Sequence, residues 1–151
     1  MERFMLEALN QAKLALKNNE VPIGCVITRN DEIIAKAFNK RMRKKDATNH
    51  AEILAIKKAC KKVRDWRLSD CTLYVTLEPC PMCAGAILNA RIPKVVFGAK
   101  DEKSGFLGGI YDISNKNILN HNIEVVGGVL ERDCSQIIKE FFAKKRKQHT
   151  L

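Results

Sequence analysis

The chain has 151 residues, of which 46% are hydrophobic and 29% are charged, a balance that is typical of one folded globular domain and excludes a disordered or membrane-embedded chain. Lysine and arginine number 27 against 17 acidic residues, which gives a formal net charge of +10. This excess favours polyanionic partners, of which nucleic acid is the leading one, although a basic surface that serves only solubility has the same composition.

The N-terminal residues and the cysteines indicate the cellular compartment. Residues 1–16 include Glu2, Arg3, Glu7 and Lys13, so they lack the uninterrupted apolar core of a secretory signal. No apolar run reaches the roughly 18 to 20 residues that a membrane span requires. We therefore expect a cytoplasmic protein with no membrane partner, whose six cysteines are buried apolar residues or metal ligands and not disulfides.

Predicted helices and strands alternate along the chain. Apolar residues at three- and four-residue steps predict helices, and short apolar runs bounded by turn residues predict strands. In chain order, the predicted elements are a helix over 2–18, strands over 23–28 and 32–38, a helix from about 50, a strand over 72–77, a helix over 82–89, strands over 94–98 and 123–126, and a helix over 131–147. Asn30 and Asp31 favour a hairpin turn, and Asp46, Thr48 or Asn49 can cap the second helix. Two strand-helix-strand units predict an α/β domain with a mixed sheet between helices.

Basic residues are concentrated in two runs, over 40–45 and 144–147. Either run can hold the phosphates that flank a bound nucleotide, in which case affinity falls steeply with salt. The alternative for each run is an ordinary solvated surface. No repeat, low-complexity tract or linker divides the chain, so we expect residues 1–151 to form a single domain that ends in a basic helix.

A metal site is indicated by the run Cys80-Pro81-Met82-Cys83, which follows a predicted strand and opens a predicted helix. A helix N-terminus lowers thiol pKa values and so favours the thiolates that bind zinc. His50, at the start of another helix, is the natural third ligand. The fourth position is either Cys71, which would close a structural site, or water, which would leave a catalytic site open. The lack of a second Cys-x-x-Cys pair favours the open site.

Glu52 lies two residues beyond His50, where a carboxylate can reach a metal-bound water without ligating the metal. Residues two apart on an ideal helix point about 200° apart. His50 must therefore occupy the cap or first position of the helix for both side chains to face one ion. The alternative is that Glu52 only complements the helix dipole, which contributes about 0.3 to 1 kcal/mol.

Together, His50-Ala51-Glu52 and Pro79-Cys80-Pro81-Met82-Cys83 resemble the zinc deaminase pattern of His-x-Glu followed by Pro-Cys-x-x-Cys. Further stretches extend this resemblance over nearly the whole chain, to the bacterial tRNA-specific adenosine deaminases of the cytidine deaminase-like superfamily. These stretches are 20–24, 90–92, 95–99, 103–105 and the late helix with Phe141-Phe142. The resemblance implies a three-layer sandwich with a five-stranded mixed sheet between helices, one Zn²⁺ per subunit and a homodimer. It also implies hydrolytic conversion of the wobble adenosine in an arginine tRNA anticodon stem-loop to inosine.

The resemblance assigns the chemistry to four residues. His50, Cys80 and Cys83 would ligate zinc, which lowers the pKa of bound water towards about 7. Glu52 would then act as the proton shuttle. It would take the water proton, deliver it to ring N1 and protonate the departing ammonia.

Four further residues are assigned to the substrate by the same resemblance. Asn39 corresponds to the asparagine that holds the target nucleotide, and Val21 and Leu77 would line the base pocket. Asp101 corresponds to a position near the bound anticodon loop. The simpler interpretations are a turn residue at a strand end for Asn39 and a solvated loop acid for Asp101.

The chain departs from the family pattern at three places. Ala47 stands where proline is usual, Asn49 where alanine is usual, and Phe106-Leu107 where smaller residues are usual. The metal motifs are unaffected. Because Asn49 neighbours His50 and Phe106 lies in a loop expected to meet the anticodon, the departures bear on RNA contacts and sequence preference.

Two other functions are compatible with these motifs. One is a zinc deaminase of a free base or nucleoside such as guanine or cytidine, for which a small neutral substrate gives no reason for a net charge of +10. The other is a zinc-stabilised RNA-binding module without catalysis, which has no use for Glu52.

Overall fold

The structure is a computed structural model that describes residues 1–114 and 121–149. In chain order, the elements are α1 (Glu2–Lys17), β1 (Gly24–Arg29), β2 (Glu32–Phe38), α2 (Ala51–Val63), β3 (Cys71–Leu77), α3 (Pro81–Asn89), β4 (Lys94–Ala99), β5 (Glu124–Val126) and α4 (Glu131–His149). Each predicted element is present in the predicted order. Of the predicted domain over 1–151, residues 115–120 and 150–151 lie outside the described residues.

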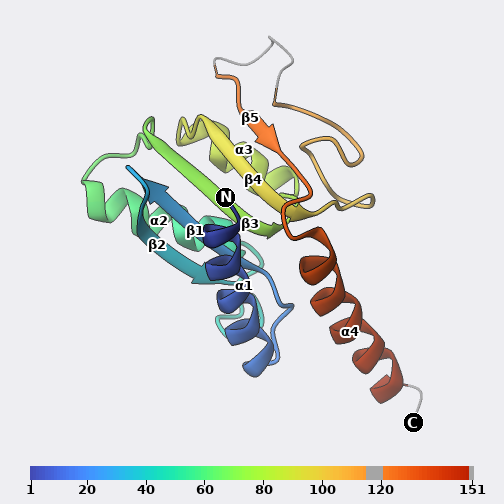
Figure 1. The fold of residues 1–151 in the computed structure, drawn as a ribbon. Helices are drawn as coiled ribbons and strands as arrows, with labels where there is room; N and C mark the ends of the chain where they lie inside the picture. The colour runs from blue at the N-terminus through green and yellow to red at the C-terminus, as the bar shows by residue number, and fades with distance from the viewer. Residues whose placement is uncertain (115–120, 150–151) are drawn as a thin grey trace.

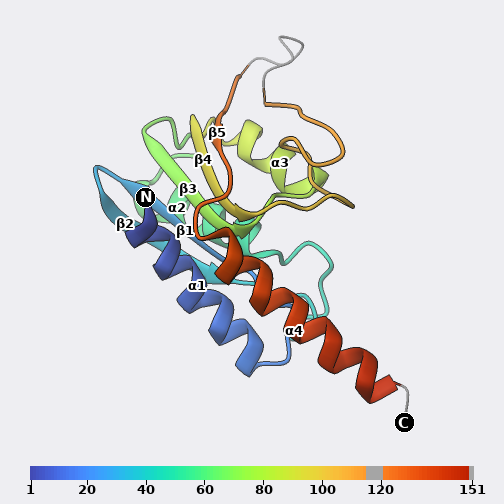
Figure 2. The same ribbon diagram turned by 45° about the vertical axis from the view of Figure 1, so that its right-hand side comes forward.

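The sheet is mixed, as predicted, with the strand order β2-β1-β3-β4-β5. Strand β1 is antiparallel to both β2 and β3, whereas β3, β4 and β5 are parallel to one another. Helices α2 and α3 cover one face of the sheet, and α1 and α4 cover the other (Figures 1 and 2). The predicted three-layer sandwich is therefore confirmed. No helix in the described ranges is both long and apolar enough to cross a bilayer.

Successive side chains along each strand point to opposite faces of the sheet, so the core has two layers. On β3, Leu73 and Val75 pack with α2 and α3 in one apolar cluster. Tyr74, between them, faces the opposite layer, where its ring centroid lies 5.2 Å from that of Phe4 in α1. On β1, a Cβ at Gly24 would overlap backbone atoms of α1, so only glycine allows the helix to lie this close to the sheet.

The turn between β1 and β2 agrees with the prediction from the sequence, whereas the N-terminal cap of α2 does not. Asn30 and Asp31 have φ values of 52° and 60°, which suit the type I′ turn of a hairpin and confirm the prediction. The predicted caps of α2 are wrong, because the N-cap is His50 and has no side-chain capping bond. Asp46 instead accepts the N–H of Thr48 at 2.9 Å and its hydroxyl at 2.7 Å, which closes the preceding turn.

The topology gathers several chain segments at one end of the sheet. The parallel strands β3 and β4 both end there. Strand β1 starts at the same end, where the N–H of Gly24 donates to Oγ1 of Thr76 at 3.1 Å. The register of β1 with β2 pairs Gly24 with Phe38, so β2 also finishes at this end. The starts of α2 and α3 are connected to these strand ends, and the candidate site lies among them.

Candidate active site

The structure brings the three predicted metal ligands together. His50 and Cys80 are the N-caps of α2 and α3, both with extended backbone, and Cys83 lies in the first turn of α3. Nδ1 of His50 lies 3.7 Å from Sγ of Cys80 and 3.5 Å from Sγ of Cys83. The three ligand atoms all lie within 4.8 Å of one another.

This arrangement fits a tetrahedral zinc ion. With Zn–S near 2.3 Å and Zn–N near 2.0 to 2.1 Å, a tetrahedron separates nitrogen from sulfur by about 3.6 Å, which matches the two observed distances. Cys83 is buried, whereas His50 and Cys80 are partly exposed. Two thiolates and an imidazole form a donor set that zinc prefers, and the partly exposed side leaves room for a small fourth ligand.

The alternative in which Cys71 closes the site is wrong. Cys71 opens β3, whereas Cys80 follows the end of that strand, and the strand spans about 20 Å at the usual rise per residue. The sulfur of Cys71 lies 3.7 Å from Oδ1 of Asp70. Among the described residues, the group that could hold a metal contains His50, Cys80 and Cys83.

The electrostatics of the cluster favour cation binding. A hydrogen bond from the Cys83 thiol lowers the pKa of Cys80 to about 4, and the hydrogen bond with Cys80 raises the pKa of His50. The hydrogen bond to Cys80, followed by burial, raises the pKa of Cys83 well above its usual value. The cluster thus favours the thiolate form of Cys80, and a cation that binds both sulfurs displaces the proton held by Cys83.

Glu52 lies in the first turn of α2 and is 4% exposed. Burial raises its pKa to about 7, and the negative charge of Cys80 acts in the same direction. The carboxyl group also contacts the Cys83 thiol. Because the backbone of His50 is extended and precedes the helix, the geometric requirement for both side chains to approach one ion is met. A carboxyl group with this pKa accepts and releases a proton at neutral pH.

The partly exposed side of the cluster borders an open cleft with a volume of about 930 Å³. His50 lines this cleft together with the four residues that the sequence assigned to the substrate, which are Val21, Asn39, Leu77 and Asp101. These residues come from four separate segments at the same end of the sheet. The fold therefore places each of them where a ligand in the cleft can meet it.

Two of these side chains are held by local hydrogen bonds. Asn39 is 4% exposed; its Nδ2 donates to the carbonyl of Val21 at 3.5 Å, and its Oδ1 accepts the N–H of Arg41 at 3.4 Å. Oδ1 of Asp101 accepts the N–H groups of Lys103 at 3.0 Å and Ser104 at 3.1 Å. Both side chains are thus oriented by the loops that carry them.

One wall of the cleft was not predicted from the sequence. It is a face of α4 formed by Glu131, Ser135, Ile138, Lys139, Phe142 and Arg146. The residues recur at helical spacing, which is the signal that identifies one face of a helix. The adjacent residues Phe141 and Phe142 differ in exposure: Phe141 is 8% exposed and lines a hollow beside α1, whereas Phe142 is 43% exposed and lines the cleft.

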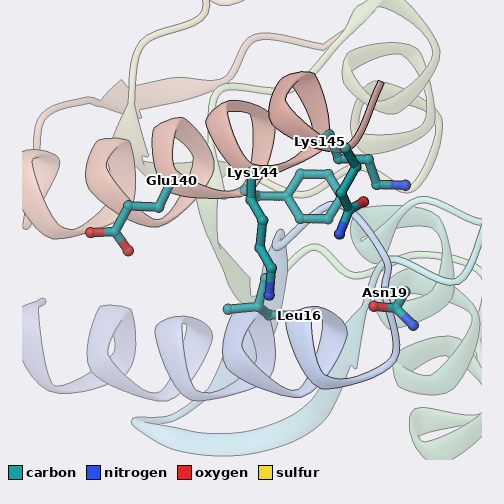
Figure 3. Close-up of a pocket in the computed structure, with 7 residues that line it drawn as sticks. Leu16, Asn19, Glu140, Lys144 and Lys145 are labelled. Atoms are coloured by element: carbon teal, nitrogen blue, oxygen red, sulfur yellow. The ribbon is translucent and has the colours of Figure 1, made fainter. Parts of the chain in front are cut away.

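The basic end of α4 is divided between two surfaces. Arg146 lines the cleft, whereas Lys144 and Lys145 line a smaller hollow of about 240 Å³ between α4 and the end of α1. In this hollow, Lys144 extends from α4 toward Leu16 of α1 (Figure 3). Its described lining includes none of the candidate metal ligands, and we place no chemistry there.

Among the described residues, the departures from the family pattern are neither candidate metal ligands nor part of the cleft lining. Asn49 is 8% exposed, and its carbonyl accepts the N–H of Lys40 at 3.0 Å. Phe106 packs against the larger core cluster, and its ring centroid lies 5.5 Å from that of Tyr111. The larger side chain at position 106 therefore contributes to the packing of its own loop.

Comparison with known proteins agrees with this geometry. A family profile described as MafB19-like deaminase matches residues 1–146. The tRNA-specific adenosine deaminase of Bacillus subtilis (strain 168) is 49% identical over 147 residues, which cover 97% of this chain and 91% of that protein. The chain belongs to the tRNA-specific adenosine deaminase family.

Solved structures of other deaminases have a fold similar to that of this deaminase. A structure from a study of A-to-I editing by tRNA:A34 deaminases at the wobble position of transfer RNA has a TM-score of 0.85 at 39% identity, covering 91% of this chain and 99% of that chain. Guanine deaminase from Bacillus subtilis is 40% identical, with a TM-score of 0.63 and coverage of 66% of this chain and 64% of that chain. The cytidine deaminase-like architecture expected for this deaminase is confirmed.

Proposed function

We propose that this deaminase is a zinc-dependent hydrolase that converts adenosine to inosine at the wobble position of tRNA, with an arginine tRNA anticodon stem-loop as its substrate. The observation that carries the proposal is the cluster of His50, Cys80 and Cys83 beside the buried Glu52, at the edge of a cleft large enough for a nucleotide. A family member 49% identical to this chain, named for the same reaction, supports the choice of substrate.

Each residue of the cluster has a defined task in this proposal. His50, Cys80 and Cys83 hold the ion, and bound zinc supplies a nucleophile at neutral pH by lowering the pKa of a coordinated water. Glu52 would take a proton from the attacking water and deliver it to N1 of adenine, so that C6 could accept hydroxide. Glu52 would then carry the proton of the new C6 hydroxyl group to the departing amino group, so that ammonia leaves and the C6 carbonyl of inosine forms.

The cleft supplies the contacts to RNA. Val21 and Leu77 enclose the base and Asn39 hydrogen-bonds to the nucleotide. The basic residues that line the cleft, namely Arg41, Lys100, Lys103, Lys139 and Arg146, neutralise the flanking phosphates. A base in a single-stranded loop enters such a site at lower cost than a base stacked in a duplex.

Turnover assays test this substrate against free compounds. The purified protein is incubated with an arginine tRNA anticodon stem-loop that carries adenosine at the wobble position, with the same stem-loop carrying guanosine there, and with free adenosine, cytidine and guanine. We expect inosine from the first substrate alone. Turnover of only the free compounds would establish the alternative, a nucleobase deaminase, for which the 40% identity to guanine deaminase is the supporting observation.

The proposal extends to assembly and compartment. We infer a single domain over 1–151, a homodimer with one Zn²⁺ per subunit and a cytoplasmic location, as the family resemblance implies. Light scattering measures the oligomeric state, and metal analysis measures the zinc content of the same sample. A monomer in solution, or a zinc content far below one ion per chain, would contradict this part of the proposal.

A further inference from the structure

Two glutamates outside the metal cluster are buried without a role in the chemistry. Glu20 follows α1 and is 0% exposed, and Glu78 follows β3 and is 2% exposed. Burial of a carboxylate is costly unless hydrogen-bond donors replace its water. In both cases the donors are backbone N–H groups of a loop that borders the cleft.

Glu78 holds the loop over residues 101–109. Its Oε1 accepts the N–H of Asp101 at 3.0 Å. Its Oε2 accepts the N–H groups of Leu107 at 2.9 Å and Gly109 at 2.7 Å. Since Glu78 lies two residues before Cys80, these bonds connect the 101–109 loop directly to the segment that carries a metal ligand.

The 101–109 loop is shaped around this carboxylate. A Cβ at Gly105 or Gly109 would overlap the carboxyl group of Glu78 and the carbonyl oxygen of Asp101. Glycine at both positions therefore lets the loop backbone close over the acid. The outer side of the same loop places Asp101 and Lys103 on the cleft wall.

Glu20 holds the loop over residues 40–45 in the same manner. Its Oε1 accepts the N–H of Met42 at 3.0 Å, and its Oε2 accepts the N–H of Arg43 at 2.6 Å. The neighbouring Arg41 lines the cleft, and its N–H donates to Oδ1 of Asn39. The position of the 40–45 loop therefore determines where the guanidinium group of Arg41 and the side-chain amide of Asn39 meet a nucleotide in the cleft.

We propose that Glu78 and Glu20 are positioning residues that set the two cleft-bordering loops for RNA recognition and take no part in the proton transfers. Both glutamates lie outside the set of described residues that line the cleft, so they act through the loops and not by contact with the substrate. The proposal rests on the proposed function for its substrate, whereas the link between each acid and its loop stands on the hydrogen bonds alone.

Substitution by glutamine tests each acid with little change of shape. Glutamine offers one acceptor oxygen and an NH₂ group that faces an N–H donor, so at least one loop bond is lost. In Glu78→Gln, we expect faster amide hydrogen exchange at the bonded amides of the 101–109 loop and unchanged exchange in the 40–45 loop. Glu20→Gln should give the reverse pattern, so each variant is the matched control for the other.

Kinetics separate positioning from chemistry. In Glu78→Gln, KM for the anticodon stem-loop should rise about tenfold, because small displacements of binding groups are costly, while kcat changes by less than about twofold and zinc is retained. Charge alone predicts the opposite result, since removing an acid near a bound polyanion strengthens binding. Glu32→Gln, an exposed site in β2, removes the same charge and should leave KM unchanged.

Several outcomes would overturn the proposal. They are an unchanged or lower KM in Glu78→Gln, a fall in kcat at constant KM, or unaltered exchange in the 101–109 loop. If Glu78→Gln does not fold, Gly109→Ala displaces the loop while the carboxylate remains, and an unchanged KM in that variant refutes the role of Glu78. If the wild-type protein did not deaminate the adenosine of the stem-loop, the proposed function would be refuted. The hydrogen-exchange patterns would still decide whether Glu78 and Glu20 hold their loops.

Discussion

Burial distinguishes Glu52 from an acid that serves only the helix dipole. Such an acid contributes about 0.3 to 1 kcal/mol and is best placed in solvent, where its charge is not penalised. Glu52 is 4% exposed, and burial is the main cause of its raised pKa. Its position is therefore explained by the neighbouring thiol and imidazole groups of the cluster and not by the helix that carries it.

Glu52→Gln should remove turnover while leaving the metal in place. The amide has nearly the same shape as the acid but transfers no proton, so kcat should fall by about 10²- to 10⁴-fold. Single-turnover assays on the anticodon stem-loop and zinc analysis of the same preparation measure both effects. If deamination persisted with zinc bound, the shuttle role would be wrong; lost activity with zinc bound would also exclude a non-catalytic RNA-binding module.

A pair of cysteine variants tests the ligand assignment. Cys83→Ala should reduce zinc affinity by more than about 100-fold, because even the loss of a hydrogen-bonding partner of a ligand costs 10- to 100-fold. Cys71→Ala is the matched control, since Cys71 is equally buried but lies at the far end of β3. Its zinc content should equal that of the unchanged protein. Loss of zinc from both variants in metal analysis would instead support Cys71 as the fourth ligand of a closed site.

At the scale of single elements, α4 has two different faces. One face packs on the sheet through Cys134 and Ile137, and Phe141 is buried beside it. Another face, with Lys139 and Phe142, lines the cleft. The helix thus stabilises the fold and completes the cleft with side chains that are adjacent in the sequence.

Adjacent phenylalanines of α4 should separate stability from binding. Phe141→Ala should lower the free energy of unfolding by about 3 kcal/mol, as expected for a buried aromatic side chain. Phe142→Ala should lower it by less than about 1 kcal/mol but weaken stem-loop binding, since an exposed aromatic ring offers a stacking surface to a base. Urea unfolding and fluorescence anisotropy measure the two effects, and equal stability losses would contradict the assignment of faces.

Paired charge variants of α4 test which surface meets the phosphates. Replacing Lys139 and Arg146 by alanine should reduce the slope of log affinity against log salt by about 1.4, because each contact with a single strand contributes about 0.7. Replacing Lys144 and Lys145, which line the other hollow, removes the same charge and should leave the slope unchanged. Equal reductions in both double variants would mean that the cleft face has no special role.

At the scale of the whole molecule, the site is assembled from segments that the sheet topology brings together. Motifs that act over a few residues could be predicted from the sequence, such as His50 with Glu52 and Cys80 with Cys83. The role of Glu78 could not, because its three donors are 23, 29 and 31 residues away in the chain. The cleft face of α4 was missed for the same reason, since the helical pattern gives spacing and not the neighbour of each face.

A zinc ion held by His50, Cys80 and Cys83 would connect the starts of α2 and α3, so its removal should loosen the molecule without unfolding it. We expect a chelator to lower Tm by at least about 5 °C, which corresponds to a loss of roughly 2 kcal/mol in a domain of this size. Far-UV circular dichroism should keep its helical signal, because both core layers are apolar and do not include the metal. The Tm of Cys83→Ala should not respond to the chelator, and a response there would indicate an unrelated metal site.

The order of the ligands along the chain has a consequence for biosynthesis. All three lie between positions 50 and 83, whereas the helix that forms one wall of the cleft spans Glu131–His149. A ribosome therefore completes the segment that carries the three candidate ligands well before it reaches the last wall of the cleft. Translation that stops before residue 131 yields a polypeptide with all three candidate ligands and an incomplete cleft.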